Sequence, residues 1–413
     1  MRQHAPIGPR GTAGLSLIEL MIALLIGTIL VLGLVQVFSA SRAAYQLSQG
    51  IARNQENARF ALDFLSRDLR MAGHAGCVND QSLLATDAGG NVTGGNIRSL
   101  FMTEAQRNAN NVAALPFPLR FDLGIQGFEA AGTGPGGAVN LATVPAAGAA
   151  TDWSPQLPVE LAGLSPIAGS DIVMLRYLSP EQAQVDGLTM AASSTINYPA
   201  ASGTVATGGS GLYALADCGG ATVFQASAAP TATEMTVSVG GLNQSDLGYV
   251  SANDGTITYK PGGATLYRAE SVAYYVRLNA QNVPALYRTR WTAPGGGALA
   301  PVTEELVEGV ESLQLLYGED SNSEDLTVLP SGHITKTNTA ATIGGAANAG
   351  RWRRVGAVQL GMMVRGGGEE RSASAQAAVP QNVLEVAMTA PSDGHYRSVY
   401  ETTVALRNRL FGN

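Results

Sequence analysis

The fold is decided near the N-terminus by residues 14–38, which read GLSLIELMIALLIGTILVLGLVQVF. From Leu15 to Phe38 the stretch holds 24 residues, is apolar, and has Glu19 as its only charge. A helix of this length spans the hydrocarbon core of a bilayer, which is about 30 Å thick. Residues 1–14 are polar and weakly basic, which predicts a cytoplasmic N-terminus and an exported remainder.

Glu19 is the informative residue of this stretch. A carboxylate in the first turn of a membrane helix is costly in lipid and needs a compensating partner. The spacing of Gly14, Leu15 and Glu19 resembles the class III prepilin signal, although Phe is more usual at the position of Leu15. The resemblance implies that a prepilin peptidase cuts between Gly14 and Leu15 and methylates the new N-terminus. It also implies that Glu19 faces a neighbouring subunit's N-terminal amine during assembly.

A secretory signal peptide is the alternative for the same segment. Ser39 and Ser41 provide a small-x-small cleavage site after the apolar run. The run is longer than the usual hydrophobic region of about 7–15 residues, and helical periodicity continues through the supposed cut. Both features favour the prepilin interpretation.

Residues 39–73 continue the helix as an amphipathic segment without proline. Asp63 and Arg67 are spaced to form an i,i+4 ion pair, and Ala72-Gly73 predicts the end of the helix. One helix from residue 15 to 72 would be about 87 Å long. Its apolar stripe is predicted to pack on the head and consists of Ala40, Ala44, Leu47, Ile51, Ala58, Leu62, Leu65 and Leu69.

Three further segments carry a family resemblance. Residues 57–73 (NARFALDFLSRDLRMAG) resemble the end of the spine helix in PilW-type minor pilins and in J-type minor pseudopilins of type II secretion. Residues 305–318 (ELVEGVESLQLLYG) are interpreted as a short helix that turns into a core strand. Residues 396–410 (YRSVYETTVALRNRL) resemble the closing strand of PilW-type proteins, in which a salt bridge or a subunit contact is predicted for Arg407 and Arg409.

The resemblance implies an α+β, pilin-like lollipop, in which a long hydrophobic spine helix packs on a β-rich globular head. The predicted organisation is a leader at 1–14, a membrane segment at 15–38, an amphipathic segment at 39–73 and a periplasmic head at 74–413. Low-complexity tracts at 127–151 and 191–211 are predicted to be loops. Strands are predicted at 171–178, 256–260, 271–278, 285–291, 313–317 and 355–365.

The two cysteines, Cys77 and Cys218, suggest one disulfide in an exported chain. It would join the end of the spine helix to a distant loop of the head. Two buried free thiols are the alternative. A metal-binding role is disfavoured because no second Cys or His stands at ligand spacing.

Charge and motifs exclude several functions. The chain of 413 residues has a net charge of −7, which is unlike a protein that neutralises nucleic-acid phosphates. Its sequence contains no catalytic signature, so no enzyme, cofactor or metal is predicted. The acidic residues Glu305, Glu308 and Glu311 are interpreted as a solvated helical face. A cluster of oxygen-bearing side chains follows Tyr317 and consists of Asp320, Asn322, Glu324 and Asp325. Such oxygens could bind calcium, but the loop lacks the EF-hand pattern.

The resemblance therefore implies a non-catalytic minor pilin that primes pilus assembly at the filament tip. The implied partners are the prepilin peptidase, other minor pilins, the major pilin and a tip adhesin. The expected location is the inner membrane with a periplasmic head, and later the pilus. A minor pseudopilin of type II secretion is the alternative within the family. A Sec-exported periplasmic binding protein and a membrane-anchored enzyme are alternatives of other classes.

Overall fold

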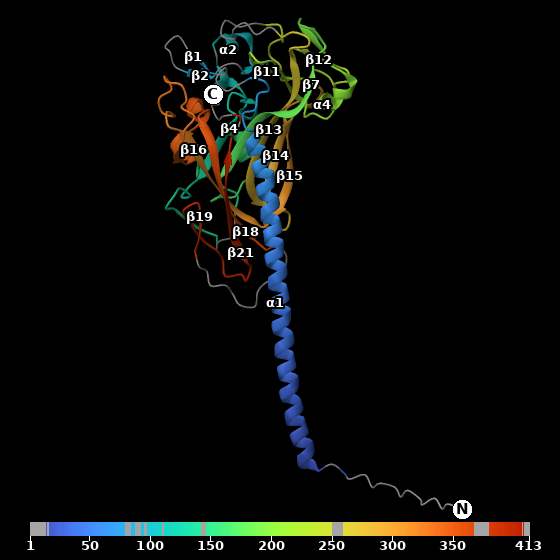
Figure 1. Ribbon diagram of the computed structural model, residues 1–413, viewed down its shortest axis with the longest axis vertical. Coiled ribbons are helices and arrows are strands. Elements are labelled where there is room, and N and C mark those ends of the chain that lie inside the picture. The colour runs from blue at the N-terminus through green and yellow to red at the C-terminus, as the bar shows by residue number, and fades with distance from the viewer. Residues whose placement is uncertain are drawn as a thin grey trace, which may run out of the picture.

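The computed structural model describes residues 14, 16–78, 84–86, 92–94, 97–109, 111–141, 146–249, 259–366, 380–406 and 408. One long helix projects from a β-rich head and begins at its far end, away from the head (Figure 1). The head gathers at the other end of the helix and lies along its last turns. This is the predicted α+β lollipop.

The helix α1 (Leu17–Met71) is continuous over 55 residues. It passes Gly50 without interruption, although that glycine lies where the helix first becomes buried. The helix ends at Ala72, and Gly73 follows with φ of 73°, a conformation that glycine adopts without steric penalty. The predicted end at Ala72-Gly73 is confirmed.

The largest sheet has nine strands and β13 at its branch point. One side of β13 pairs with β7, while the other side pairs first with β10 and then with β14. The strand order is β3 (Ile97–Ser99), β11 (Ala221–Gln225), β10 (Leu212–Ala216), β13 (Thr265–Leu278), β7 (Ile172–Gln184), β4 (Ile125–Ala130) and β6 (Trp153–Ser154). In addition, β14 (Pro284–Thr292) pairs with β13, and β15 (Ala300–Glu308) pairs with β14.

A four-stranded sheet contributes the second layer of the head. Its order is β17 (Ile334–Asn338), β16 (Val310–Asp320), β18 (Val355–Arg365) and β21 (Arg397–Ala405). The main core lies where this sheet, the large sheet and α1 meet. Its central side chains are Leu65, Leu69, Val173, Leu175, Val272, Tyr274, Leu315, Tyr317, Leu360 and Met362.

Smaller elements complete the head. The strands are β12 (Glu234–Ser238), β9 (Ser193–Asn197) and β8 (Gly187–Thr189) in one sheet, β19 (Gln381–Val383), β20 (Val386–Thr389) and β5 (Ala138–Asn140) in another, and the pair β1 (Leu84–Thr86) and β2 (Val92–Gly94). The short helices are α2 (Glu104–Asn108), α3 (Val159–Ala162), α4 (Gly203–Thr207), α5 (Ala340–Ile343) and α6 (Ala349–Trp352).

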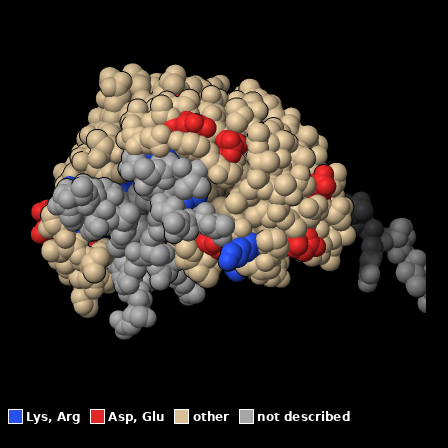
Figure 2. Space-filling model, turned by 90° about the horizontal axis from the view of Figure 1, so that it is seen from above, with Lys and Arg blue, Asp and Glu red and all other residues tan. Residues whose placement is uncertain are grey.

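The β12-β9-β8 sheet and α4 form a lobe at the far ends of β7 and β13, with its own core around Ile196, Tyr198 and Met235. Figure 2 shows the head from above, where the described surface is mostly uncharged, with scattered acidic side chains and little positive charge. That end of the head therefore offers no extended basic surface on the part that the structure describes.

Most of the predicted strands are confirmed, and β18 has the predicted bounds. Residues 171–178, 271–278, 285–291 and 313–317 fall within or at the start of β7, β13, β14 and β16. Of the strand predicted at 256–260, the first three residues lie outside the described part of the chain. Tyr259 and Lys260 are not in a strand.

The predicted helix at the start of 305–318 is wrong. Glu305 and Glu308 belong to β15, Glu311 belongs to β16, and Gly309 connects the two strands with φ of 90°. Every residue of β16 is buried, so the segment lacks the polar alternation that identifies a strand with one exposed face.

The two low-complexity tracts are more ordered than predicted. The first contains part of β4 together with β5, and the second contains β9 and α4. Gly127 lies in β4, where a Cβ atom would stand 1.9 Å from the hydroxyl oxygen of Tyr317. Close packing against Tyr317, rather than flexibility, therefore requires a glycine there.

Candidate functional site

The first turn of α1 is capped by Ser16. Its Oγ accepts a hydrogen bond from the backbone N–H of Glu19 at 3.2 Å. Glu19 thus lies where the helix dipole favours a negative charge. Among the described residues its carboxylate makes no ion pair, and it is exposed. Gly14 is exposed as well, whereas Leu15 lies outside the described residues.

The segment after Glu19 presents apolar side chains on every side. Its mean hydropathy reaches 2.7 over the most apolar window, and none of that window is buried by the rest of the protein. Leu17, Leu34 and Phe38 are each exposed over 70% or more of their surface. A helix that is apolar all round fits membrane anchoring, with the head on the periplasmic side.

The head first meets the helix at Gly50. A Cβ atom on Gly366 would stand 3.3 Å from the carbonyl oxygen of Gly50, so the two backbones are closely apposed. One turn later, Asn54 Nδ2 donates to the carbonyl of Val364 at 2.6 Å, and its Oδ1 accepts from the hydroxyl of Tyr400 at 3.0 Å. These directional bonds fix how the helix is rotated and how far it is advanced along the sheet.

Asp68 makes a second polar contact within the same packing face. Its carboxylate accepts from the hydroxyl of Tyr274 at 2.6 Å and lies 3.5 Å from a guanidinium nitrogen of Arg288. Burial, together with Asp68, raises the pKa of Tyr274 well above its ordinary value, so this phenol stays a donor. Sequence periodicity did not identify Asn54 or Asp68, because both are polar residues on a face expected to be apolar.

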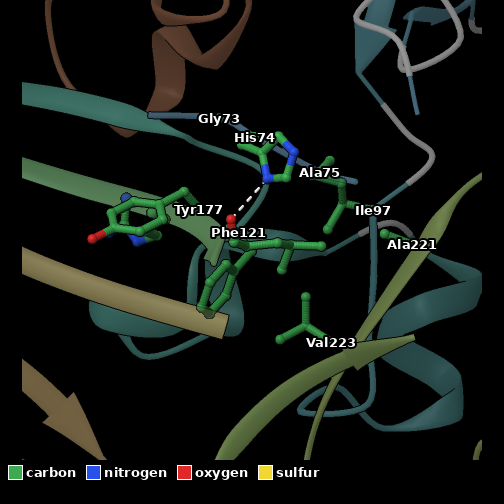
Figure 3. Close-up of a pocket in the computed structure, with 10 residues that line it drawn as sticks. Gly73, His74, Ala75, Ile97, Phe121, Tyr177, Ala221 and Val223 are labelled. Atoms are coloured by element: carbon green, nitrogen blue, oxygen red, sulfur yellow. Dashed lines mark hydrogen bonds between the residues drawn. The ribbon is translucent and has the colours of Figure 1, made fainter. Parts of the chain in front are cut away.

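The end of α1 is joined to the edge of β7 by a short ladder. Gly73 N–H donates to the carbonyl of Arg176 at 2.9 Å, and Leu178 N–H donates to the carbonyl of His74 at 2.8 Å. His74 Nδ1 lies 2.7 Å from the carbonyl of Leu178, as the dashed line in Figure 3 shows. The void between these residues and Phe121 measures about 10 Å³, which suits a water molecule and no larger ligand.

The predicted disulfide between Cys77 and Cys218 is confirmed. The Cα atoms lie 4.7 Å apart across a sequence separation of 141 residues. The bond joins the chain just after α1 to the turn between β10 and β11. Asn408 Nδ2 donates to the carbonyl of Arg70 at 3.0 Å, so the C-terminal segment also holds the helix end. Arg407 and Arg409, for which a contact was predicted, lie outside the described residues.

The predicted acidic candidates have structural partners. Glu311 is buried and pairs with Arg397 at 2.7 Å, while Glu305 and Glu308 accept from the side chain of Asn279. Asp320 accepts N–H bonds from Asn322, Ser331 and Gly332, which lower the pKa of Asp320 and hold the loop. Within the described ranges no three His, Cys, Asp or Glu residues gather as a metal site.

A buried carboxyl pair lies where the two large sheets meet. Asp171 accepts N–H bonds from Ala130 and Leu315, at 2.8 and 2.9 Å, and so joins β4 to β16. Thr133 Oγ1 lies 3.3 Å from Glu129 and 3.2 Å from Asp171, between the two carboxyl groups. Burial raises the pKa of Glu129 to about 7, and burial with the charge of Glu129 raises that of Asp171.

We expect the head to be more stable near pH 5 than near pH 8. A carboxyl whose pKa is higher in the folded than in the unfolded chain takes up a proton on folding, so its contribution is lost as the pH rises through the folded value. For Glu129 that window runs from 4.5 to about 7, and Asp171 acts in the same direction. Thermal unfolding of the detergent-solubilised chain at the two pH values measures the difference.

Glu129→Gln resembles the protonated carboxyl and should reduce this pH dependence by stabilising the head at pH 8. Glu56→Gln is the matched control, because Glu56 is exposed on α1. Equal melting temperatures for the original chain at both pH values would contradict the assignment.

The comparisons with known proteins match both ends of the chain. Residues 9–35 match the model of the prokaryotic N-terminal methylation motif, which covers Gly14 and Glu19. Residues 273–408 match the model of the type IV pilus-assembly protein W, or PilW, family. The two matches together support a PilW-type, pilin-like protein. Neither a curated protein nor a solved structure matches it.

The PilW match covers a definite part of the fold. It runs from the second half of β13 to Asn408 and so includes the four-stranded sheet. It also includes Val364 and Tyr400, which are the hydrogen-bond partners of Asn54. Residues 36–272, including the lobe around β9 and β12, lie outside both matches. Both families are structural, and they imply contacts with pilus components and with a prepilin peptidase.

Proposed function

We propose that this PilW-type protein is a minor type IV pilin that primes pilus assembly at the filament tip without catalysis. The observation that supports this most is the exposed apolar helix, which carries one carboxylate in its first turn and leaves the head as a rigid extension of it. The apolar side chains of such a helix are buried in lipid before assembly and against the helices of other subunits afterwards.

The proposed partners follow from the two halves of the molecule. The prepilin peptidase recognises the leader and cuts after Gly14. The carboxylate of Glu19 compensates the positive charge of the N-terminal amine of an adjacent subunit. The head docks on other minor pilins and on the major pilin, with a tip adhesin as a further partner. The protein resides in the inner membrane until it is drawn into the filament.

A direct test is to locate the protein. An epitope-tagged chain should be recovered in sheared pili at low stoichiometry and be found at one filament end by immunogold labelling. Deletion of its gene should reduce the number of surface pili. Uniform labelling along the filaments would contradict the tip assignment, and absence from pili would contradict the pilin role.

The alternative cut by signal peptidase is disfavoured by the structure of the segment. Ser39 lies inside α1, and its hydroxyl donates to the carbonyl of Gln36 at 2.9 Å. A signal peptide cut here would divide a continuous helix, whereas a cut after Gly14 leaves α1 whole.

We expect mass spectrometry of the mature protein to show an N-terminus at Leu15. Gly14→Val should abolish this cut and leave the leader attached, because a branched side chain obstructs the peptidase. Gly11→Val, within the leader, is the matched control and should be processed normally. A mature N-terminus near residue 42 would instead support the secretory signal peptide.

A further inference from the structure

A short stretch of α1 lies between the apolar segment that ends at Phe38 and the head, and it belongs to neither. It comprises residues 39–49, and none of these is buried by the part of the chain that the structure describes. Figure 1 shows this part of the helix standing clear of the head, which the helix first meets at Gly50. The stretch is rich in serine, alanine and glutamine rather than uniformly apolar. We call it the helix neck.

The helix neck contains one charged residue, Arg42. Between Glu19 and Arg53 the sequence has no other charge. The side chain of Arg42 is exposed, and it makes no ion pair or hydrogen bond with another residue that the structure describes. Its guanidinium group thus differs from that of Arg397, which is buried against Glu311. The partner of Arg42 is therefore to be sought outside the chain.

The position of Arg42 along the helix matches the far side of a bilayer. Glu19 and Arg42 lie 23 residues apart on one continuous helix, which is about 35 Å along its axis. The hydrocarbon core is about 30 Å thick, and the headgroup layer adds about 5–7 Å on each side. When the first turn of α1 lies at the cytoplasmic edge of the core, Arg42 consequently reaches the headgroup layer on the periplasmic side.

Tyr45 is a second residue that suits the headgroup layer. Its side chain is 63% exposed, and its hydroxyl accepts a hydrogen bond from Gln49 Nε2 at 2.5 Å. Tyrosine is enriched at membrane–water interfaces, because its ring is apolar and its hydroxyl is polar. Tyr45 follows Arg42 by three residues and so shares its face of the helix. That face lies roughly opposite to the one that packs on the head, so the head leaves it open to lipid.

We propose that Arg42 binds the lipid phosphate groups of the periplasmic leaflet, with Tyr45 beside it, and that the two residues fix the depth of the unassembled subunit in the membrane. A guanidinium group matches a phosphate in charge and in bidentate geometry. From Arg42 to Gly50 the helix rises about 12 Å, so the head is held clear of the lipid. The inference rests on the membrane-anchored state in the proposed function and adds the ligand that sets its depth.

The test measures the depth of a fluorescent dye on the full-length chain in vesicles of phosphatidylethanolamine and phosphatidylglycerol. Cys77 and Cys218 are bonded to each other, so only an introduced cysteine takes up the dye. With the dye on Ser39→Cys, quenching by lipids that carry a nitroxide at a shallow or a deep position gives the depth. When Arg42→Leu and Tyr45→Leu are added, the dye should move about 3–5 Å toward the bilayer centre, because the longer apolar run sinks or tilts.

The original chain should show the same displacement in vesicles of digalactosyldiacylglycerol, a lipid that carries no phosphate. Arg42→Lys should leave the depth unchanged, because a lysine side chain also reaches the phosphate layer with its charge. Arg59→Leu is the matched control, since Arg59 is exposed on α1 beyond the helix neck. It should leave the depth unchanged as well.

An unchanged depth after Arg42→Leu and Tyr45→Leu would overturn the inference and leave membrane anchoring intact. An equal depth of the original chain in the two lipids would exclude phosphate as the ligand. Efficient disulfide cross-linking between Gln49→Cys chains would show that a second copy covers this face instead, and would overturn the inference too. A dye on Val35→Cys that no lipid nitroxide quenches would overturn membrane anchoring and this inference together.

Discussion

Glu19→Ala should reduce recovery of the protein in sheared pili at least tenfold, with normal export, normal cleavage after Gly14 and a folded head. Removal of one member of a buried charge pair typically costs about 3–5 kcal/mol, because the other charge is left without compensation. In the proposed assembly that other charge is the amine of the adjacent subunit. Quantitative immunoblots of sheared pili and of membranes measure the ratio.

Glu19→Val should give the same loss, because the missing charge and not the missing volume is responsible. Thr28→Val is the matched control. Thr28 is exposed on the same membrane segment and bonds only the carbonyl of Leu25 in its own helix. Recovery of both Glu19 variants at the original level would remove the carboxylate from the assembly mechanism. A defect in cleavage would instead assign Glu19 to recognition by the peptidase.

The role of Glu19 need not begin with assembly. Before a neighbour is present, the carboxylate occupies the first turn, where unpaired backbone N–H groups and the helix dipole favour a negative charge. The Ser16 cap holds that turn in place. The free subunit thus keeps its charged residue in the first turn, where the helix dipole favours a negative charge, as the proposed pairing with a neighbour's amine requires.

The elements that sequence predicted well are those with a long or simple pattern. The apolar run and the helical periodicity gave α1 with its end at Ala72. A mostly apolar run that includes Val355, Val358 and Val364 gave β18 with its bounds. Two cysteines in an exported chain gave the disulfide. The predictions of α1 and β18 depend on the local residue pattern, and the prediction of the disulfide depends on the number of cysteines.

The contacts that sequence could not give are long-range and polar. Asn54 meets Val364 and Tyr400, and Asp68 meets Tyr274, across sequence separations of more than 200 residues. No local pattern identifies such residues, because the sequence of an amphipathic helix does not distinguish a buried, hydrogen-bonded polar residue from a solvent-exposed one. The partners of Asn54 lie in the part matched by the PilW model, so an alignment of relatives would be the signal to seek.

The buried pair of Glu129 and Asp171 was missed for a related reason. Glu129 lies in a tract whose glycines and alanines suggested a loop, yet β4 is buried along its whole length. Gly127 is required by the approach of Tyr317 from the other sheet. Composition alone does not distinguish a glycine that provides flexibility from one that permits close packing.

Replacement of both cysteines should give the largest loss of head stability. With Cys77→Ser and Cys218→Ser combined, the unfolding free energy of the detergent-solubilised chain should fall by about 5 kcal/mol in the chain-entropy treatment of a loop of this length. The bond closes a separation of 141 residues, so the unfolded chain gains much freedom when it is lost. Denaturant titration, followed by tryptophan fluorescence, measures the change.

In the folded protein, loss of the disulfide should loosen only the residues next to the two former cysteines. The chain on either side of the bond is held by other hydrogen bonds. Gly73 and His74 remain joined to β7, and Asp217 Oδ1 still accepts N–H bonds from Gly219 and Gly220, at 2.8 and 3.0 Å. Hydrogen exchange should therefore rise first around Ala75–Val78 while β7 stays protected. Ala75→Ser is the matched control for adding a hydroxyl in the same segment. A double-serine chain as stable as the original would show that the ladder at Gly73 and the Asn408 contact alone hold the helix end to the head.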